Sequence, residues 1–481
     1  MKIILLNTPT CLYPKTGRVE KYNTIPPYGL GYIAISLSNV IGKNNIKLID
    51  AEYLGLSPKR ATQMILENKP DFIGINCHSP NFYIMKLIIK KLAGEHINKH
   101  SVIVGGTHAI LFPEQILKDK HIGKYIAFVA TGEGEKPLTE FVSGIKKEDI
   151  KGISFSKGNE IISTPPNNLN NEELNKLIID RTFFDNDPNE WNDGKTKESY
   201  IMSSRGCSYR CSFCAARLIS KGRIRIRSNE SILEELKLLI DSGVNYVRFL
   251  DDLLFVSKKR IKYLFNIFNS LGLNYTNFGF EANARVNILS TLEKKEWDNL
   301  KLIGLKEIEI GIESGSQRVL DIMKKRTTPN QIVKTVTEAA KRGIKIKGFL
   351  MVGFISETNA DLQKTIELVK ELKKIAGSLI RFSPVPAKVY PGTKLRDDLK
   401  FNIDNTYDTV LDLSKEFNIN EQSEIYKILK DRTRYNAIHT YNGKPIALSE
   451  MTNGASTKTV IKALAELILI SSEKMLKSTS V

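Results

Sequence analysis

Three cysteines crowd into one short segment, SSRGCSYRCSFCAAR, where Cys207, Cys211 and Cys214 have the spacing C-x3-C-x2-C. Three thiolates in one loop can converge on a single soft metal centre. Zinc usually takes four protein ligands, but the next cysteine upstream is Cys77 and the next histidine downstream is His439. A [4Fe–4S] cluster held by three cysteines leaves one iron open to a substrate or cofactor. The spacing favours such a cluster over the alternatives, a zinc knuckle or incidental thiols.

The segment around these cysteines is basic and contains no acid from residue 205 to residue 227. Its cations are Arg205, Arg210, Arg217, Lys221, Arg223, Arg225 and Arg227. Nearby cations favour the reduced state of an iron–sulfur cluster. GRIRIRS alternates with period two, which places its three arginines on one face of a strand. One of them could hold an anionic group; the alternative is a solvated edge strand.

The composition of the whole chain is that of a globular protein. The chain has 481 residues, a formal net charge of +18, 41% hydrophobic residues and 26% charged residues. This predicts two or three domains and excludes wholesale disorder and a small disulfide-stapled fold. Most of the positive charge lies in residues 201–400. A basic block indicates nucleic acid, an anionic cofactor or an acidic substrate, and the plainer alternative is a lysine-rich solvated surface.

Targeting and membrane signals are weak in this sequence. No apolar run approaches the ~18 residues that a membrane-spanning helix needs. The segment MKIILLNTPT has no small-residue cleavage site. Five cysteines are also few for this length. We therefore expect a cytoplasmic protein without a membrane span, whose cysteines serve metal or redox chemistry rather than disulfides.

Residues 1–165 alternate between short apolar runs and segments of helical period. This predicts an α/β domain with a doubly wound parallel sheet, whose ligands bind beyond the carboxyl ends of the strands. The loops expected there contain Thr8, His78, Ser79, Gly105, Gly106, Thr107, Gly132, Glu133 and Gly134.

The rest of the chain divides into three further segments. Residues 166–198 are rich in Asn, Asp, Pro and Glu and are predicted to be a linker or surface crossing. Residues 199–395 again alternate and predict a partial (β/α)6 barrel with its chemistry at the carboxyl end of the strands. Residues 396–481 have a helical pattern, and we expect this C-terminal region to contribute to substrate specificity. Tyr390 and Arg381 are further candidates for the cavity.

The cysteine loop and four downstream segments together resemble the radical S-adenosylmethionine superfamily. These segments, in chain order, are FLDDLLF (249–255), GIESGSQRVL (311–320), GFLMVGFISET (348–358) and PVPAKVYPGTKL (384–395). Upstream, PPYGLGYIAISL, IVGGTHAILFPEQIL and TGEGE resemble the cobalamin-binding domain that precedes the barrel in a large subgroup. The resemblance implies three cofactors: a [4Fe–4S] cluster on the three cysteines, S-adenosylmethionine and cobalamin.

The resemblance also implies roles for individual residues. Phe213 would pack on the adenine, with plain loop packing as the alternative. Asp251 and Asp252 would bind the ribose hydroxyls or the methionine ammonium. Glu313 and Ser314 would contact the ribose or the substrate, and Gly353 would allow backbone to approach the adenine. The alternative for Glu313 is a salt bridge to Arg285.

The cobalamin-binding segment departs from one familiar pattern. D-x-H-x-x-G, which places a histidine on cobalt in many cobalamin proteins, does not occur here. The lower axial ligand should therefore not be that histidine. We expect His78 to lie near the lower face of cobalt or to ligate it; the alternative is a capping or packing residue. The glycine loops at 105–106 and 132–134 would hold the nucleotide tail and the side amides of the corrin.

The function that the resemblance implies is C-methylation of an unactivated carbon of a natural-product substrate, using a 5′-deoxyadenosyl radical and methylcobalamin. The substrate would be a small molecule or a peptide, and the electron would come from a flavodoxin or ferredoxin type of reductant. The alternatives are a cobalamin-dependent radical cyclase or ring-rearranging enzyme, a tRNA methylthiotransferase and a non-enzymatic cobalamin sensor. Only Cys11 and Cys77 precede the barrel, too few for a methylthiotransferase's second cluster, and we expect no nucleic-acid partner.

Overall fold

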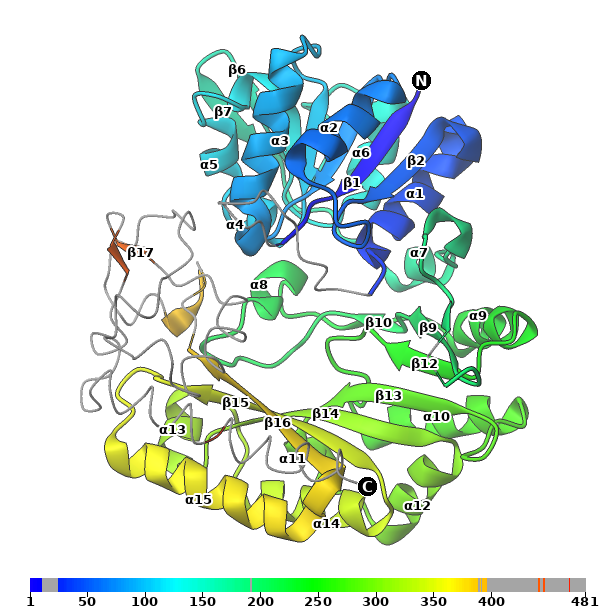
Figure 1. Ribbon diagram of the computed structural model, residues 1–481, viewed down its shortest axis with the longest axis vertical. Helices are drawn as coiled ribbons and strands as arrows, with labels where there is room; N and C mark the ends of the chain where they lie inside the picture. Colours follow the sequence, from blue (N-terminus) through cyan, green and yellow to red (C-terminus); the bar gives the residue numbers. More distant parts are fainter. Residues whose placement is uncertain are drawn as a thin grey trace. The chain divides into compact units, whose positions relative to one another are not determined.

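The computed structural model describes residues 1–10, 25–190, 193–387, 390, 392–395, 440–441, 444–445 and 467. The chain divides into two compact units, Met1–Asn189 and Glu190–Val481 (Figure 1). Each unit is described by itself below. Nearly all of the helical region predicted at 396–481 lies outside the described residues. No helix within the described ranges has the length and apolar character needed to cross a membrane.

The first unit is built on a seven-stranded sheet with the order β2-β1-β3-β4-β5-β6-β7. Neighbouring strands from β1 to β5 pair in parallel, and β6 and β7 add an antiparallel edge. The strands are β1 (Ile3–Asn7), β2 (Ile46–Asp50), β3 (Phe72–Asn76), β4 (Val102–Gly105), β5 (Ile126–Ala130), β6 (Ile153–Lys157) and β7 (Glu160–Ser163).

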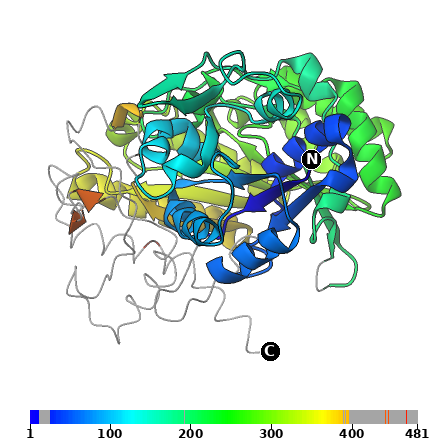
Figure 2. The same cartoon turned by 90° about the horizontal axis from the view of Figure 1, so that it is seen from above.

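Strand β1 shows why this sheet is covered on both faces (Figure 2). Its residues are buried throughout, and alternate side chains enter different cores. Ile4 and Leu6 pack with helices α2, α3 and α5, whereas Ile3 and Leu5 pack with α1 and α6. The helices are α1 (Tyr28–Ile41), α2 (Pro58–Glu67), α3 (Phe82–Gly94), α4 (Thr107–Leu111), α5 (Pro113–Leu117) and α6 (Glu135–Val142). The predicted doubly wound parallel sheet is confirmed.

The polar segment after β7 packs back on the first unit through Phe184. The Phe184 ring stacks on Tyr28 of α1, with 5.2 Å between ring centroids. A Cβ on Gly31 would lie 2.4 Å from the same ring, so α1 needs a glycine there. This segment also contains α7 (Asn171–Asn175), which begins with a capping box formed by Asn170 and Glu173.

The second unit contains a sheet in which β9, β12, β13, β14, β15 and β16 follow one another in chain order. Every one of these neighbouring pairs is parallel, and β8 (Asn189–Glu190) lies at the edge next to β9. The strands are β9 (Lys197–Ile201), β12 (Tyr246–Phe249), β13 (Gly279–Ala284), β14 (Leu305–Glu313), β15 (Lys345–Val352) and β16 (Ile380–Pro386). This arrangement confirms the predicted partial barrel.

Helices cover one face of this second sheet, as α14 and α15 do in Figure 1. Alternate strand residues such as Val247, Phe280 and Ile308 are fully buried in the core between sheet and helices. The helices are α9 (Asn229–Asp241), α10 (Lys258–Ser270), α11 (Val286–Leu289), α12 (Lys294–Leu302), α13 (Gln317–Ile322), α14 (Pro329–Lys341) and α15 (Asn359–Ala376). Several begin at a Ser or Thr N-cap whose side chain accepts a backbone N–H, which fixes where each helix starts.

The intervening strand residues carry a charged network along the other face of the sheet. Arg248 bridges Glu198, at 2.6 Å, and Glu281, at 3.0 Å. Arg381 forms an ion pair with Glu307 near the start of its strand. Since the strands are parallel, their starts lie at the edge opposite the cysteine loop, and the prediction that Arg381 lines the cavity is wrong.

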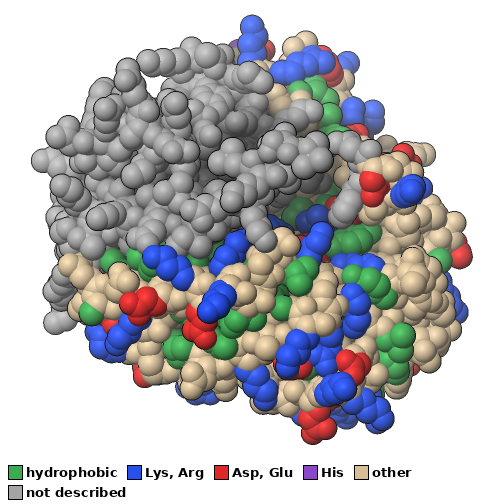
Figure 3. Space-filling model, turned by 60° about the horizontal axis from the view of Figure 1, so that its bottom comes forward, with side chains coloured by type: hydrophobic (Ala, Val, Ile, Leu, Met, Phe, Trp, Pro, Cys, Tyr) green, Lys and Arg blue, Asp and Glu red, His purple; other side chains and the backbone are tan. Residues whose placement is uncertain are grey.

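Charged side chains of both signs are dispersed over the described part of one face of the molecule (Figure 3). On the face shown in Figure 3, Lys and Arg side chains are interspersed with Asp and Glu rather than gathered into one continuous basic area. Examples of the surface ion pairs are Lys258 with Glu296, at 3.1 Å, and Lys118 with Glu114, at 2.7 Å. This face favours the interpretation of the positive charge as solvated surface.

The charged network predicts a pH-dependent stability. Burial and the neighbouring carboxylates raise the pKa of Glu281 to about 7, although Arg248 opposes the shift. A carboxyl with a raised pKa holds its proton more tightly in the folded state. Its stabilising contribution is therefore complete below the unfolded value of about 4.5 and is lost as the pH rises through about 7. The free energy of unfolding of the wild type should therefore fall as the pH rises from about 5 to about 8. Glu281→Gln has no carboxyl to titrate, so its free energy of unfolding should fall less over this range, by up to about 3 kcal/mol.

Urea unfolding at the two pH values measures this difference. Glu338→Gln is the matched control, because Lys341 and Arg342 lower the pKa of that carboxyl, so that it does not titrate in this range. Equal pH dependence in wild type and Glu281→Gln would contradict the prediction.

Candidate functional site

The cysteine loop lies beyond the carboxyl end of β9, after the short strand β10 (Ser204–Arg205). Gly206 has φ +98°, and a Cβ there would lie 2.2 Å from the carbonyl oxygen of Arg223, so only glycine fits. Ser212 fixes the middle of the loop: its N–H donates to the Met323 carbonyl at 2.9 Å, and its carbonyl accepts from Leu395 N–H at 2.9 Å. These backbone bonds join the loop to the residue that follows α13 and to Leu395, beyond the end of β16.

The three predicted ligands Cys207, Cys211 and Cys214 are partly buried free thiols. Burial raises the pKa of Cys207 and raises that of Cys214 to about 11, and the charges of the neighbouring thiolates add to both shifts. Within the described ranges, no three His, Cys, Asp or Glu side chains converge closely enough to hold a metal ion. The donors that the loop offers are three thiols, which fits a [4Fe–4S] cluster better than a four-ligand zinc site. Coordination itself would deprotonate them.

Arg285, which directly follows β13, contacts the cysteine loop after β9. One Nη1–H donates to Cys211 Sγ at 3.2 Å. The guanidinium carbon lies 3.8 Å from the centre of the Tyr209 ring. The predicted alternative, a salt bridge between Arg285 and Glu313, is therefore wrong.

Glu313 pairs instead with Lys325, at 2.6 Å, and both side chains are buried. Glu313 has φ +64° and follows an irregularity in the pairing of β14 with β15. A Cβ on Gly311 would lie 2.3 Å from both charged groups, so a glycine is needed to leave room for the pair. This strained backbone at the end of a strand marks a position where side-chain direction matters more than local stability.

Ser314 is fully buried and serves the loop itself. Its Oγ lies 3.1 Å from Thr365 Oγ1 of α15 and accepts a hydrogen bond from Ser316 N–H at 3.1 Å. A Cβ on Gly315 would lie 2.3 Å from the Lys364 carbonyl oxygen. The Glu-Ser-Gly segment thus packs tightly on α15 and orients Glu313.

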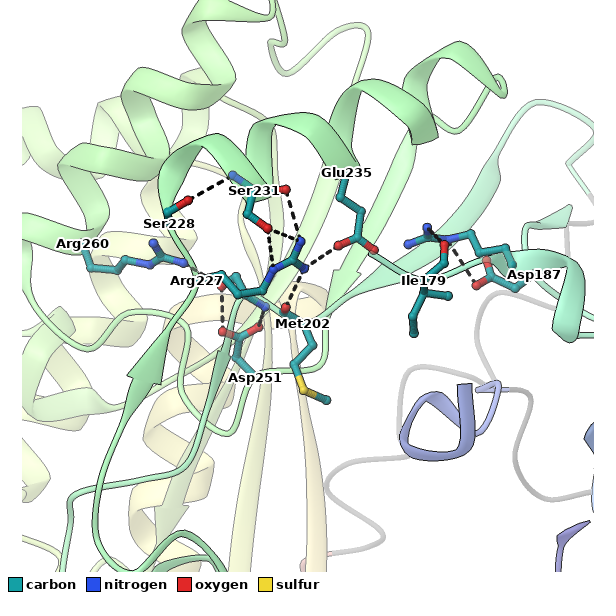
Figure 4. A network of polar contacts seen from close by, with 11 residues as sticks. Ile179, Asp187, Met202, Arg227, Ser228, Ser231, Glu235, Asp251 and Arg260 are labelled. Carbon is teal, nitrogen blue, oxygen red and sulfur yellow. Dashed lines mark hydrogen bonds and ion pairs between the residues drawn. The ribbon is translucent and has the colours of Figure 1, made fainter. Parts of the chain in front are cut away.

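Asp251 and Asp252 differ sharply although they are adjacent. Asp251 is fully buried, and its oxygens accept from Ser203 N–H at 2.9 Å, from Ser203 Oγ at 2.7 Å and from Ser204 Oγ. Arg260 donates to the same Ser203 hydroxyl at 2.7 Å (Figure 4). Asp251 therefore orders the turn before the cysteine loop.

Asp252 is exposed, and its Oδ2 accepts from Gly206 N–H at 3.0 Å. The surrounding protein raises the pKa of this carboxyl, while the bond from Gly206 opposes the shift. Of the two predicted ribose or ammonium ligands, Asp252 is the exposed one and Asp251 is enclosed.

Arg227, the last cation of the basic segment, is committed to a structural network (Figure 4). It is buried, forms an ion pair with Glu235 of α9, and donates to the Met202 carbonyl at 3.1 Å and to the Ser231 carbonyl at 3.1 Å. Arg225 belongs to β11 (Arg225–Ile226), which pairs antiparallel with β10. Residues 205–227 contain no acid, and the carboxylate that neutralises Arg227 comes from α9.

Phe213 belongs to the cysteine loop, and Gly353 follows the end of β15. Phe213 packs edge-on to Phe354, with ring centroids 6.4 Å apart, in a small apolar cluster. Gly353 has φ +74°, and its N–H donates to Glu357 Oε2 at 2.6 Å. Burial raises the pKa of Glu357 to about 7. Tyr390, the remaining cavity candidate, lies close enough to Cys214 for that thiolate, together with burial, to raise the pKa of its phenol.

In the first unit, polar side chains gather where the strand order reverses, between β1 and β3. Asn7 donates to Asp50 at 2.8 Å, Asn76 donates to Asn7 at 3.3 Å, and Asn76 Nδ2 lies 3.1 Å from His78 Nε2. The last member of this series of hydrogen bonds is Thr107, whose Oγ1 lies 2.8 Å from His78 Nδ1. Such switch points are where doubly wound sheets bind ligands.

This chain of bonds fixes the state of His78. Since the Asn76 amide nitrogen can only donate, His78 Nε2 accepts, and Nδ1–H donates to Thr107. Burial lowers the pKa of His78, which keeps the ring neutral. Both ring nitrogens are therefore engaged, so direct ligation of a metal would require the bond to Asn76 to break.

The other predicted residues of this edge have distinct surroundings. Ser79 Oγ lies 3.1 Å from Nδ1 of the buried His108, whose ring stacks on Phe82 with 4.2 Å between centroids. Gly106 has φ +99°, and a Cβ there would lie 2.5 Å from Asn76 Oδ1. Thr8 is fully buried, and its hydroxyl has no hydrogen-bond partner within the described structure.

The last glycine loop is held by contacts within the unit. Glu133 Oε2 accepts from Leu169 N–H at 2.8 Å. Cβ atoms would lie 3.2 Å from Asn168 Oδ1 at Gly132 and 2.9 Å from Ile33 at Gly134. Gly105, by contrast, would meet only an ordinary contact.

The sequence also placed Asn7, Asp50 and Asn76 in the loops where a ligand is expected, because each is a polar residue that ends a buried apolar strand. It did not predict Lys325, and it considered Arg285 only as a partner of Glu313. These two cations have no local signal, because their partners lie elsewhere in the chain.

Comparison with known proteins finds a family match for each of the two units. Residues 201–369 match the Radical SAM superfamily, and residues 15–142 match the B12 binding domain. An uncharacterized methyltransferase of Pyrococcus horikoshii is 30% identical over 82% of this chain and 82% of its own length. An anaerobic magnesium-protoporphyrin IX monomethyl ester cyclase of Cereibacter sphaeroides is 23% identical over 83% of this chain and 64% of its own length.

The fold matches a solved structure over most of the chain. The radical S-adenosylmethionine methyltransferase TsrM from Kitasatospora setae, solved with cobalamin and a [4Fe–4S] cluster, superposes with a TM-score of 0.63 and 16% sequence identity. The match covers 83% of this chain and 75% of that protein. With the identity to the Pyrococcus methyltransferase and both domain matches, the chain belongs to the cobalamin-dependent radical S-adenosylmethionine methyltransferase family.

Proposed function

We propose that this enzyme methylates an unactivated carbon of a natural-product substrate, either a small molecule or a peptide. The observation that carries the proposal is the loop of three thiols at the carboxyl edge of a parallel half-barrel, in a chain that also has a B12 binding domain. When bound, the cluster and S-adenosylmethionine supply a radical that abstracts hydrogen, and cobalamin supplies the methyl group.

The second unit's residues would hold and orient the first two cofactors. Cys207, Cys211 and Cys214 are the cluster ligands. Asp252 is placed to accept from the ribose hydroxyls or the ammonium, because it is exposed beside Cys207. Glu313, held by Lys325, offers a second carboxylate at the same edge.

The first unit's residues would hold cobalamin at the switch point of its sheet. The neutral His78 and the Thr107 hydroxyl bonded to it would lie toward the lower face of the corrin. The Thr8 hydroxyl, which has no hydrogen-bond partner among the described residues, is a further donor at this edge. Gly105 and Gly106 would let the corrin approach the backbone at the end of β4. The 132–134 loop would contact the nucleotide tail or the side amides of the corrin.

The names of the relatives support methyl transfer, and one of them supports an alternative. Both the Pyrococcus relative and TsrM are described as methyltransferases. The Cereibacter relative is described as a cyclase, which favours a cobalamin-dependent ring-forming reaction as the second candidate. In either case we propose a cytoplasmic enzyme that receives single electrons from a flavodoxin or ferredoxin type of protein.

The cluster and its chemistry can be tested by anaerobic reconstitution. Wild-type enzyme with iron, sulfide, S-adenosylmethionine and dithionite should release 5′-deoxyadenosine, as measured by chromatography. Replacing Cys207, Cys211 or Cys214 with Ala should remove that product, because all three thiolates are needed to hold the cluster.

The matched control is Cys77→Ala, which removes a buried thiol of the first unit. It should retain product formation. Absence of 5′-deoxyadenosine from wild type with an intact cluster would contradict every radical mechanism. Once a substrate is known, a mass gain of one CH2 per event indicates methylation, and its absence indicates the ring-forming alternative.

The position of His78 predicts a spectroscopic result. His78→Ala should shift the absorption spectrum of bound cob(III)alamin, because the variant removes a ring near the lower face. Any nitrogen superhyperfine splitting in the electron paramagnetic resonance spectrum of bound cob(II)alamin should be the same in both proteins, because Asn76 occupies His78 Nε2.

The exposed His121, which comes before β5 begins and not after its carboxyl end, supplies the control His121→Ala, which should leave both spectra unchanged. An unchanged absorption spectrum in His78→Ala would remove His78 from the cobalamin site. Nitrogen splitting that disappears in His78→Ala would show direct ligation instead.

A further inference from the structure

Arg285 is a buried cation whose guanidinium is fixed on several sides. Its residue is only 8% exposed. The planar group lies on the Tyr209 ring, Nη2 donates to the Lys325 carbonyl, and Nε lies 3.3 Å from Asn287 Oδ1. The remaining contact is the 3.2 Å hydrogen bond from Nη1 to Cys211 Sγ. The guanidinium therefore has one orientation, with an N–H directed at a cluster ligand.

No carboxylate within the described ranges forms an ion pair with Arg285. Two other buried arginines of this unit lie beside a carboxylate: Arg227 pairs with Glu235, and Arg260 donates to the Ser203 hydroxyl that also bonds Asp251. A buried cation without a counter-ion is costly, and natural proteins rarely retain one. Among the described residues, the acidic group that accepts a hydrogen bond from Arg285 is the Cys211 thiol, so the counter-charge is assigned to that thiolate.

We propose that Arg285 is the counter-ion of the iron–sulfur centre, a positioning residue that sets the reduction potential through Cys211. This inference rests on the proposed function, because it requires the cluster. Reduction adds one electron, supplied by dithionite in the test or by the protein reductant, and adds no proton. The sulfur becomes a stronger acceptor, and its charge-assisted bond to the guanidinium strengthens. Arg285 thus stabilises the reduced form and raises the potential.

Two other buried cations of this unit have carboxylate partners. Lys325 is neutralised by Glu313 at 2.6 Å. Arg227 is neutralised by Glu235. The basic segment 205–227 predicts cations around the cluster, but the cation that contacts a ligand sulfur comes from 74 residues further along the chain.

The test is a redox titration of reconstituted enzyme, with the reduced cluster followed by electron paramagnetic resonance. Iron and sulfide contents are measured first. Arg285→Gln should lower the ratio of reduced to oxidised cluster at a fixed potential by about tenfold, which corresponds to about 59 mV for one electron. Arg285→Lys keeps the charge but loses the planar fork, and its shift should be smaller.

Two control variants should leave the potential unchanged. Tyr209→Phe keeps the ring beneath the guanidinium and loses only the hydroxyl that accepts from Asn287 at 3.1 Å. Arg342→Gln removes an equal charge at the end of α14, just before β15 begins and thus at the opposite edge of the sheet.

Each outcome separates this inference from the function on which it depends. A lower potential in Arg285→Gln alone, or loss of the cluster in Arg285→Gln with retention in Arg285→Lys, supports it. A full cluster with the wild-type potential in Arg285→Gln overturns it and leaves the proposed function intact. Failure of the wild type to assemble a cluster overturns the proposed function itself.

Discussion

Parallel strand pairing is the constraint on which both sites depend. When every strand of a sheet runs the same way, all the carboxyl ends meet at one edge, and residues far apart in the chain become neighbours. In the second unit this brings the cysteine loop after β9, Asp252 after β12, Arg285 after β13 and Glu313 at the end of β14 to one edge. In the first unit the same rule joins the ends of β1, β2 and β3 in the chain of bonds from Asp50 to His78.

Burial of charge then decides what each side chain can do. Asp251 accepts hydrogen bonds from Ser203 and Ser204 and so orders the turn before the cysteine loop, while its neighbour Asp252 stays exposed. Lys325 and Glu313 neutralise each other, whereas Arg285 has a thiol as its acceptor. A low-dielectric site makes each unmatched charge expensive, and this cost links the basic residues to the redox chemistry proposed for the loop.

Much of the fold could be predicted from sequence because its signals are local. The alternation in residues 199–395 predicts strands and helices such as β12 and α9, because apolar runs and helical period are properties of consecutive residues. The ligand spacing of the three cysteines is likewise local. The assignment of Arg381 to the cavity failed for the opposite reason: its place near the start of β16 puts it at the wrong edge, where Glu307 binds it.

The sequence by itself determined which residues can supply thiolates, which segments become strands and helices, and that two α/β units follow one another. Only the tertiary structure decided which charges meet. Arg285 contacts Cys211 and not Glu313, and His78 is held by Asn76 and Thr107 in one tautomer. The physical reason is that these contacts depend on strand register and on backbone geometry at the strand ends, such as the positive φ of Glu313, and neither is a property of any local run of residues.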